Sequence, residues 1–197
     1  QILIGSTTGT GDNASIYIGN DATTVGNANT SVTDCVFIGN NAGSVMTNDR
    51  SIAIGTNSLE AATGADNIAI GSDAGNAIVT AFGNVCMGTD GLKLTTGNLN
   101  VGIGTRAGNA ITSGTENVFI GADSDGSAAL DNQIAIGRSA TCDLANQCTI
   151  GNSSLAIIRP GADNVCDLGE SDRAFKDLYM DGNATIGGDL VLTGDLN

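Results

Sequence analysis

Cysteine and aspartate are the side chains of this sequence that could do chemistry or hold a metal ion. The chain has 5 Cys and 18 Asp, and it has no His. Without His, the sequence excludes a His-based catalytic triad, a His general base and a His metal ligand. The acids are spread over all the turns, so no two carboxylates stand out as the acid and base of a glycosidase. We therefore expect a protein that is not an enzyme.

The five cysteines, Cys35, Cys86, Cys142, Cys148 and Cys166, show no Cys-x-x-Cys spacing, and their number is odd. Cys86 and Cys148 occupy apolar positions of expected strands, where the usual role of Cys is that of a small buried hydrophobe. A disulfide between Cys142 and Cys148 is one alternative. Free thiols fit assembly in a reducing cytoplasm better than secretion.

The segment Asp123–Gly126, Asp-Ser-Asp-Gly, is the best candidate for a calcium site. It lacks the later acid of an EF-hand loop, and no Gly-Gly-x-Gly-x-Asp nonapeptide recurs. Asp and Asn also satisfy turn backbones and keep a protein soluble. We expect this second role and no cofactor, with a structural calcium ion at a turn or on a symmetry axis as the alternative.

The segment Gly102-x-Gly104-x-x-Ala107 formally matches a dinucleotide-binding fingerprint. No long helix and no distant acid for a ribose follow it. A Walker A motif is excluded, because neither of the two lysines, Lys93 and Lys176, follows a Gly. We therefore interpret these glycines as part of a repeat.

The composition favours a thin, repetitive fold. The 197 residues include 29 Gly and 1 Pro, but only 4 Phe, 2 Tyr and no Trp, which is too few aromatic residues for a thick core. The net charge of −14 makes the chain a poor ligand for nucleic acid. No window approaches the apolar length of a membrane span, so we expect no nucleic-acid binding and no membrane insertion.

One tetrapeptide, apolar–x–Ile–Gly, recurs along most of the chain, once with Met in place of Ile, and its glycines lie 14 to 20 residues apart. An Asn often precedes it. Because the chain begins inside a copy, we expect it to be a fragment or a processed product of a longer polypeptide. The ten copies are Ile2–Gly5, Ile16–Gly19, Val36–Gly39, Ile52–Gly55, Ile68–Gly71, Val85–Gly88, Val101–Gly104, Val118–Gly121, Ile134–Gly137 and Cys148–Gly151.

Each copy predicts a short strand followed by a sharp turn. The apolar–x–apolar alternation places the first and third side chains on one face of a strand, and Gly permits a turn that a Cβ would hinder. A unit of about 16 residues cannot bury its own apolar face, so such units stack. We therefore predict an all-β fold, a parallel β-solenoid or β-roll of about ten coils with repeats of 14–20 residues.

The middle residue of each expected strand is also apolar or small. We expect the first and third side chains to face the interior of the coil and the middle one to face outward. Since a strand that is apolar on both faces is covered on both faces, we expect the middle row to pack against identical chains in a homotrimer. The candidate trimer-interface residues are Leu3, Tyr17, Phe37, Ala53, Ala69, Cys86, Phe119 and Ala135.

The segment Asn117–Gly121, Asn-Val-Phe-Ile-Gly, and its copies resemble the head repeats of trimeric autotransporter adhesins, whose motif is Asn-Ser-Val-Ala-Ile-Gly. The resemblance covers roughly residues 1–154. It implies a trimeric, left-handed parallel β-roll. Similar repeats occur in fibre proteins of phages and large viruses, so the resemblance is specific for architecture and much less so for biology.

Residues 168–179 resemble a motif of tail fibres, Leu-Gly followed by Phe-Lys-Asp-Leu-Tyr, which in that family precedes an intramolecular chaperone of the endosialidase type. The Gly-Asp-Leu pair within residues 187–196 resembles the β-hairpin stem of such fibres. No chaperone domain follows before Asn197, so we expect it to be cleaved or absent. The resemblance therefore implies a tail fibre.

The residues of this neck agree with a short helix. Ser171 is a suitable N-cap, and Phe175, Leu178 and Tyr179 then fall on one helical face, so we expect these three to pack in the neck. An alternative role is a cap that closes the solenoid. The expected domains are a β-roll at 1–154, a neck or cap at 155–182 and the start of a β-hairpin stem at 183–197.

From these features we expect a structural fibre protein of a phage or related virus, located in the virion. It would form a homotrimeric spacer that presents or forms a contact with a host cell-surface receptor, a glycan or a protein. One alternative is a trimeric adhesin head on a bacterial surface. Another is a monomeric ice- or calcium-binding solenoid, against which we count the lack of a Thr row at one fixed position of the repeat.

Overall fold

The computed structural model describes residues 2–4, 15–19, 34–46, 50–155, 157 and 158, with the backbone alone for residues 2–4. The chain divides into two units, Gln1–Leu155 and Ala156–Asn197, and all strands of the described residues lie in the first. The predicted neck with Phe175, Leu178 and Tyr179, and the predicted stem, lie outside the described residues.

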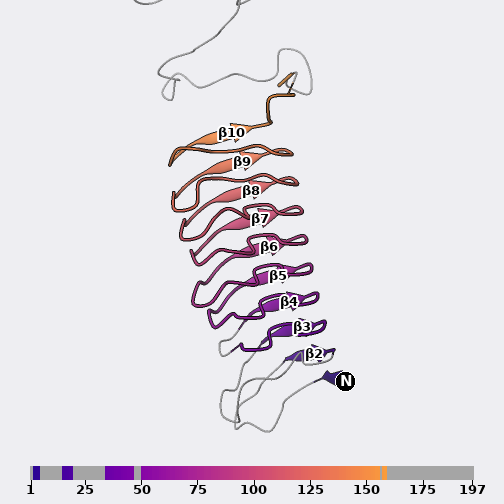
Figure 1. The fold of residues 1–197 in the computed structure, drawn as a ribbon. Coiled ribbons are helices and arrows are strands. Elements are labelled where there is room, and N and C mark those ends of the chain that lie inside the picture. Colours follow the sequence, from indigo (N-terminus) through magenta and orange to yellow (C-terminus); the bar gives the residue numbers. More distant parts are fainter. Residues whose placement is uncertain (1, 5–14, 20–33, 47–49, 156, 159–197) are drawn as a thin grey trace, which may run out of the picture. The chain divides into compact units, whose positions relative to one another are not determined.

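Ten strands of three residues form one sheet in chain order (Figure 1). Neighbouring strands from β2 to β10 pair in parallel, whereas β1 pairs with β2 in the antiparallel direction. The strands are β1 (Ile2–Ile4), β2 (Ile16–Ile18), β3 (Val36–Ile38), β4 (Ile52–Ile54), β5 (Ile68–Ile70), β6 (Val85–Met87), β7 (Val101–Ile103), β8 (Val118–Ile120), β9 (Ile134–Ile136) and β10 (Cys148–Ile150).

The predicted fold class is confirmed: the described chain is an all-β, parallel β-solenoid of about 7 turns, and its described residues contain no helix. The predicted number of about ten coils is not shown by the described residues. All ten tetrapeptides do supply a strand, but β1 runs antiparallel and so is not a further turn of the same winding. In each parallel pair the same repeat position faces itself, as in Ala53 beside Ala69, so every position of the repeat forms a row.

The Gly after each strand from β2 to β10 makes the corner of the coil. Gly88 has φ +126°, a backbone conformation open to Gly and to few other residues. A Cβ on Gly88 would also lie 2.5 Å from the carbonyl oxygen of Gly104 in the next coil. Both the angle and the close approach between coils therefore require Gly at this position.

Opposite the sheet, the described coils have a second segment outside the strands, which we call the back wall; residues 61–63, 77–79, 94–96 and 110–112 are examples. Its backbone hydrogen bonds run from coil to coil, as from Ala77 N to the Lys93 carbonyl oxygen (2.9 Å) and from Thr112 N to that of Ala128 (2.8 Å). Each coil is thus hydrogen-bonded to its neighbour at both the sheet and the back wall.

The interior of the solenoid lies between the sheet and the back wall. The middle residues of the strands point into it, so the prediction that they face outward is wrong. Phe37, Ala53, Ala69, Cys86, Phe119 and Ala135 are fully buried within the single chain and Tyr17 is 6% exposed, while Leu3 lies where the structure describes only the backbone. These side chains are buried inside their own chain, so they do not form an outward row.

Side chains of the strands and of the turns that follow them fit by size. Gly102 is the one Gly at a middle position between β2 and β10, and a Cβ there would lie 2.7 Å from Leu92 Cγ, in the turn after β6. Phe119 fills the space that Gly108 leaves in the turn after β7, where a Cβ would lie 2.8 Å from its ring. Large residues of the strands thus meet small ones of the turns, and the reverse, as close packing of a narrow core requires.

The Asn residues that precede β5, β6, β7 and β8 form a polar ladder inside the core. Asn67, Asn84, Asn100 and Asn117 are fully buried. The Oδ1 of each of the first three accepts a hydrogen bond from the backbone N–H of the next Asn, at 2.9–3.0 Å. The Asn100 Nδ2 donates to the Gly114 carbonyl at 2.9 Å. The ladder thus satisfies backbone groups that would otherwise be buried without partners.

Candidate interaction surfaces

The outer side of the sheet, which we call the front face, carries two apolar rows. Since the middle side chain of each strand points inward, the first and third point outward. They are half-buried or exposed, with Met87, Ile103, Ile120 and Ile136 each 38% exposed. From β2 to β10 the first row is Ile16, Val36, Ile52, Ile68, Val85, Val101, Val118, Ile134 and Cys148, and the third is Ile18, Ile38, Ile54, Ile70, Met87, Ile103, Ile120, Ile136 and Ile150.

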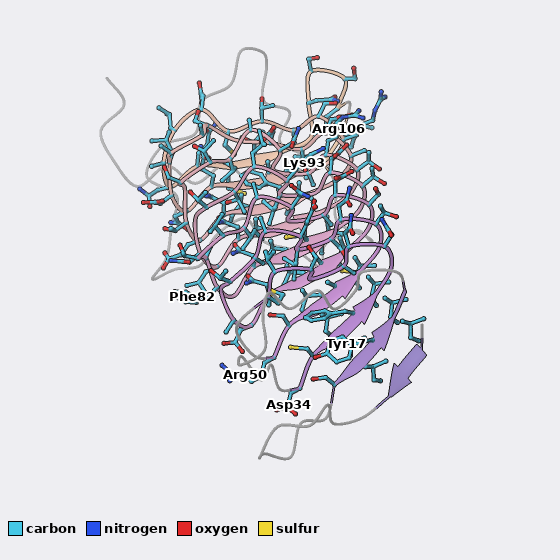
Figure 2. All side chains as sticks on the ribbon, turned by 60° about the horizontal axis from the view of Figure 1, so that its bottom comes forward. Tyr17, Asp34, Arg50, Phe82, Lys93 and Arg106 are labelled. Carbon is cyan, nitrogen blue, oxygen red and sulfur yellow. The ribbon has the colours of Figure 1, made fainter. Side chains whose placement is uncertain are left out.

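Charged side chains gather on the two edges that separate the front face from the back wall. At the edge before the strands, Arg50 pairs with Asp66 of the next coil at 2.7 Å. At the edge after them, Arg106 pairs with Asp123 at 2.6 Å. Figure 2 shows Phe82 toward one edge of the stack and Arg106 toward the other. Neither row of the front face contains Asp, Glu, Lys or Arg in its described part.

The ion pairs at the edges shift the pKa values of their residues but add little to the stability of the fold. The hydrogen bond from Arg50 lowers the pKa of the exposed Asp66 carboxyl. The hydrogen bond to Asp90 raises the pKa of Lys93. Exposed pairs contribute little because water and salt screen them. Their effect is to reduce the electrostatic repulsion between acidic residues of neighbouring coils.

The outward side of the back wall, which we call the back face, has no charged residue in its two rows, although the Asp125 carboxylate accepts a hydrogen bond from Ala110 N in the first row (2.9 Å). The residues between its two rows, such as Ile78 and Ile111, are fully buried, so those on either side point outward. The rows contain small or apolar residues and Thr. The first is Val45, Ala61, Ala77, Leu94 and Ala110, and the second is Thr63, Val79, Thr96, Thr112 and Ala128.

Three Thr hydroxyls of the back face make the same contact. Thr63, Thr96 and Thr112 each donate through Oγ1 to the carbonyl oxygen of the facing residue in the next coil, at 2.5, 3.0 and 3.1 Å. The statement that Thr occupies no fixed position of the repeat is therefore wrong for the back wall. The coils differ by one residue in length, which hides this alignment in the sequence.

The candidate calcium segment is engaged in protein contacts. Asp123 pairs with Arg106, and the Asp125 carboxylate accepts hydrogen bonds from the backbone N–H of Ala110 (2.9 Å) and Gly126 (2.9 Å). Partial burial raises the pKa of Asp125, against the opposing effect of these hydrogen bonds. Among the described residues, no three His, Cys, Asp or Glu side chains form a group that could hold a metal ion.

The cysteines differ in exposure. Cys86 is fully buried in the core, as predicted, and burial raises the pKa of its thiol to about 12, so the thiol stays protonated. Cys148 was also expected to be buried, but it is exposed in the first row of the front face. No disulfide joins it to Cys142, whose thiol lies 3.3 Å from the Ile134 carbonyl oxygen. Cys166 lies outside the described residues.

The apparent dinucleotide fingerprint is part of the solenoid. Gly102 is the middle residue of β7 and faces Leu92, and Gly104 is the corner that follows. A turn and the back wall come next, with no helix whose N-terminus could hold a phosphate. The fingerprint therefore reflects core packing.

Comparison of the chain with protein-family models, with curated proteins and with solved structures gives no match. Within the described residues no helix has the length and apolarity of a membrane span. The front face, whose described strands carry no charged residue, is thus the feature on which a function can be argued.

Proposed function

We propose that this chain is a homotrimeric fibre segment of a phage or related virus, a stiff spacer that carries or forms a contact with the host surface. The observation that carries the proposal is the front face. Its two rows of Ile and Val run along the sheet without a charged residue in the described strands. The resemblance of residues 168–179 to tail-fibre necks supports the viral setting.

The front face has the properties of a contact surface between chains. Its side chains take no part in the core, because the middle residues fill the interior. An outward position of a soluble sheet normally carries polar residues. Contiguous apolar surface that remains exposed on a soluble chain marks an interaction site.

Burial of the front face can provide the free energy of association. Full burial of an exposed Ile or Val is worth about 1.5–3 kcal/mol, so covering the exposed third of one such side chain contributes on the order of 0.5–1 kcal/mol. Summed over both rows, this is on the order of 10 kcal/mol per chain. That sum is comparable to the cost of bringing chains together, about 4–15 kcal/mol.

A cyclic trimer suits both the shape and the charge of the chain. Three front faces around one axis bury one another while all three solenoids run in the same direction, so a neck can continue the fibre. The acidic edges then lie away from the axis, where three chains of −14 are best solvated. The trimer interface we propose is therefore the pair of front-face rows in place of the middle residues.

A test of the assembly is Ile103→Asp, which introduces a charge at the centre of the front face. We expect the variant to be monomeric in light scattering at concentrations where the full chain is trimeric, because three buried carboxylates would meet near one axis. The matched control is Thr105→Asp, exposed at the edge two residues on, which should remain trimeric. Equal masses for the two variants would contradict a front-face interface.

A trimeric adhesin head on a bacterial surface is the second candidate, because the repeat resembles that family and the front face fits its trimeric architecture equally well. The polypeptide beyond Asn197 discriminates between the two. A chaperone domain there supports the fibre, whereas a coiled-coil stalk with a membrane anchor supports the adhesin.

A further inference from the structure

The two apolar rows of the front face cannot by themselves align one chain with the next. From β3 to β9 both rows are Ile or Val in every coil, apart from Met87. A chain displaced by one coil, about 4.8 Å, would therefore make nearly the same apolar contacts. Residues that differ from coil to coil have to fix the alignment, and these lie on the two edges of the front face.

The edge after the strands carries an arginine without an ion-pair partner. Arg138 follows β9 by two residues and is exposed. The described residues contain four Lys and Arg side chains, and each of the other three pairs with an Asp of its own chain at 2.6 or 2.7 Å. A guanidinium favours a carboxylate as its partner. An unpaired one in an acidic chain therefore indicates an acid of another chain.

The edge before the strands carries acids in the coils of β8 and β9. Glu116 precedes β8 by two residues and Asp131 precedes β9 by three, and both are exposed. Within the described part of the chain Glu116 forms no ion pair. The Asp131 carboxylate accepts hydrogen bonds from N (2.7 Å) and Oγ1 (3.0 Å) of Thr115. These two acids thus belong to the coil of Arg138 and to the coil before it, on the opposite edge of the sheet.

An exposed apolar pair interrupts the edge before the strands in the coils of β6 and β7. Phe82 and Leu99 are each 48% exposed. Leu99 has φ +58°, at a position where other coils have Asp66 or Asn132 with similar angles. A left-handed conformation is unfavourable for Leu, so folding alone does not account for an exposed Leu here. On the opposite edge, Arg106 follows β7 with a side chain that is 52% exposed (Figure 2).

The inference rests on the proposed function, because it needs front faces arranged around one axis. A rotation about an axis parallel to the stack keeps each coil at its height. It also brings the edge after the strands of one chain beside the edge before the strands of the next. We propose that these two edges bind each other, with Arg138 of one chain between Glu116 and Asp131 of the next and with Arg106 over Phe82. The partner of each edge is thus a second copy of this chain.

The contact is complementary in charge and in polarity. Arg138 can reach an acid one coil away, because the spacing of about 4.8 Å is shorter than an Arg side chain. Arginine stacks on aromatic surface as well as pairing with acids, so Arg106 can keep Asp123 and still cover Phe82. If the chains slipped by two coils toward β7, Arg138 would face the apolar pair and lose both acids. The edges therefore select one alignment of the chains.

The test is a charge swap in the full chain, read by sedimentation velocity of labelled protein from nanomolar to micromolar concentration. Glu116→Arg and Arg138→Glu each bring like charges together, so we expect each to raise the concentration of half-dissociation about tenfold or more. The double variant reverses both charges and should return to within about threefold of the unaltered chain, with Asp131 keeping the recovery incomplete. Both single variants should fold, because Arg50 occupies the position of Glu116 in another coil and Arg138 is exposed.

The matched control is Asp143→Arg, which changes the net charge as Glu116→Arg does, at an exposed position five residues before β10. It should dissociate within about twofold of the unaltered chain. The effect of Glu116→Arg should also shrink at high salt, which screens exposed charges.

A second variant addresses the apolar pair. Leu99→Asn introduces the residue that occupies this position at Asn132 and that tolerates a left-handed backbone better than Leu. The free energy of unfolding of the single chain, measured in the Ile103→Asp background, should stay the same or rise. The concentration of half-dissociation of the assembly should nevertheless rise about threefold or more.

The outcomes separate this inference from the proposed function. A trimer whose association is unchanged in Glu116→Arg, or whose double variant is no better than the single ones, overturns the edge contact and leaves the trimer standing. A dimer in which the charge swap restores association contradicts the trimer and leaves the edge contact standing. The mass of one chain at all these concentrations contradicts both.

Discussion

On the front face the outward side chains are Ile and Val in nearly every coil, whereas on the back face they are mostly Ala and Thr. Both walls have the same backbone plan, in which one residue points inward between two that point outward. In each wall the inward residue fills the core. Folding therefore does not determine which residue types occupy the two outward positions. The outward pairs of the two walls are therefore free to differ, and the trimer we propose uses the front pair.

The largest effect expected is at the corner that joins the two walls. Gly88→Ala forces a Cβ against the Gly104 carbonyl at a φ of +126°. We expect a loss of about 3 kcal/mol or more in the free energy of unfolding, measured by urea denaturation. Because the corner connects the two walls, we expect the front and back faces to unfold together in a single transition. Loss of the front face alone would show that the walls fold independently.

The next effect is at the opposite corner, in the Asn ladder. Asn100→Ala removes the acceptor of the Asn117 N–H and the donor to the Gly114 carbonyl, so two buried backbone groups lose their partners. We expect a loss of about 2–4 kcal/mol in the free energy of unfolding. The control Thr105→Ala, at an exposed edge position, should change it by less than about 0.5 kcal/mol. A similar loss in both would contradict a specific role for the ladder.

Cys148 provides a reporter for the front face alone. Its exposed thiol lies in the first front-face row, so an alkylating reagent should modify it rapidly in the monomeric Ile103→Asp variant and slowly in the assembled chain. Buried Cys86 should be unreactive in both, as read by mass spectrometry of its peptide. Rapid modification of Cys148 in the unaltered chain would place this row outside any interface.

The smallest effect concerns Asp125, whose carboxylate is hydrogen-bonded to Ala110 N of the back wall, and it depends on pH. Because the pKa of Asp125 is raised in the folded chain, the folded state binds this proton more tightly than the unfolded state. Its ionisation therefore costs stability above the folded pKa, and the cost disappears as the pH falls through that pKa to the unfolded value of 3.8. Relative to Asp125→Asn, the unaltered chain should gain stability on acidification. A difference that does not vary with pH would contradict this.

Strand positions and parallel register could be predicted from the sequence, because the Gly corner recurs with each strand and fixes where each coil turns. Inside and outside could not be assigned by the same means, since the middle and flanking residues are all apolar. The sizes of these residues nevertheless distinguish the middle positions from the flanking ones. The flanking rows are Ile and Val except at Met87 and Cys148, as a regular contact surface requires, whereas the middle row varies from Gly102 to Phe119, as a core that fits residue by residue requires.

The back face could not be predicted, because its alignment depends on hydrogen bonds across coils of unequal length. Thr63 and Thr96 lie at one position of the fold, and Val79 lies between them in a coil one residue longer. The Asn before the strand was visible as a recurrent residue, but its role needs the geometry of three consecutive coils. The local sequence pattern thus determines where each strand lies, whereas the composition of each surface depends on how the coils stack.

The mass of the unaltered chain in solution tests the central claim most directly. Light scattering under native conditions should give about three times the chain mass of 19.5 kDa, independent of concentration in the micromolar range. Trimer mass would agree with burial of the front face between chains. A mass of one chain, or of two, would contradict the homotrimer.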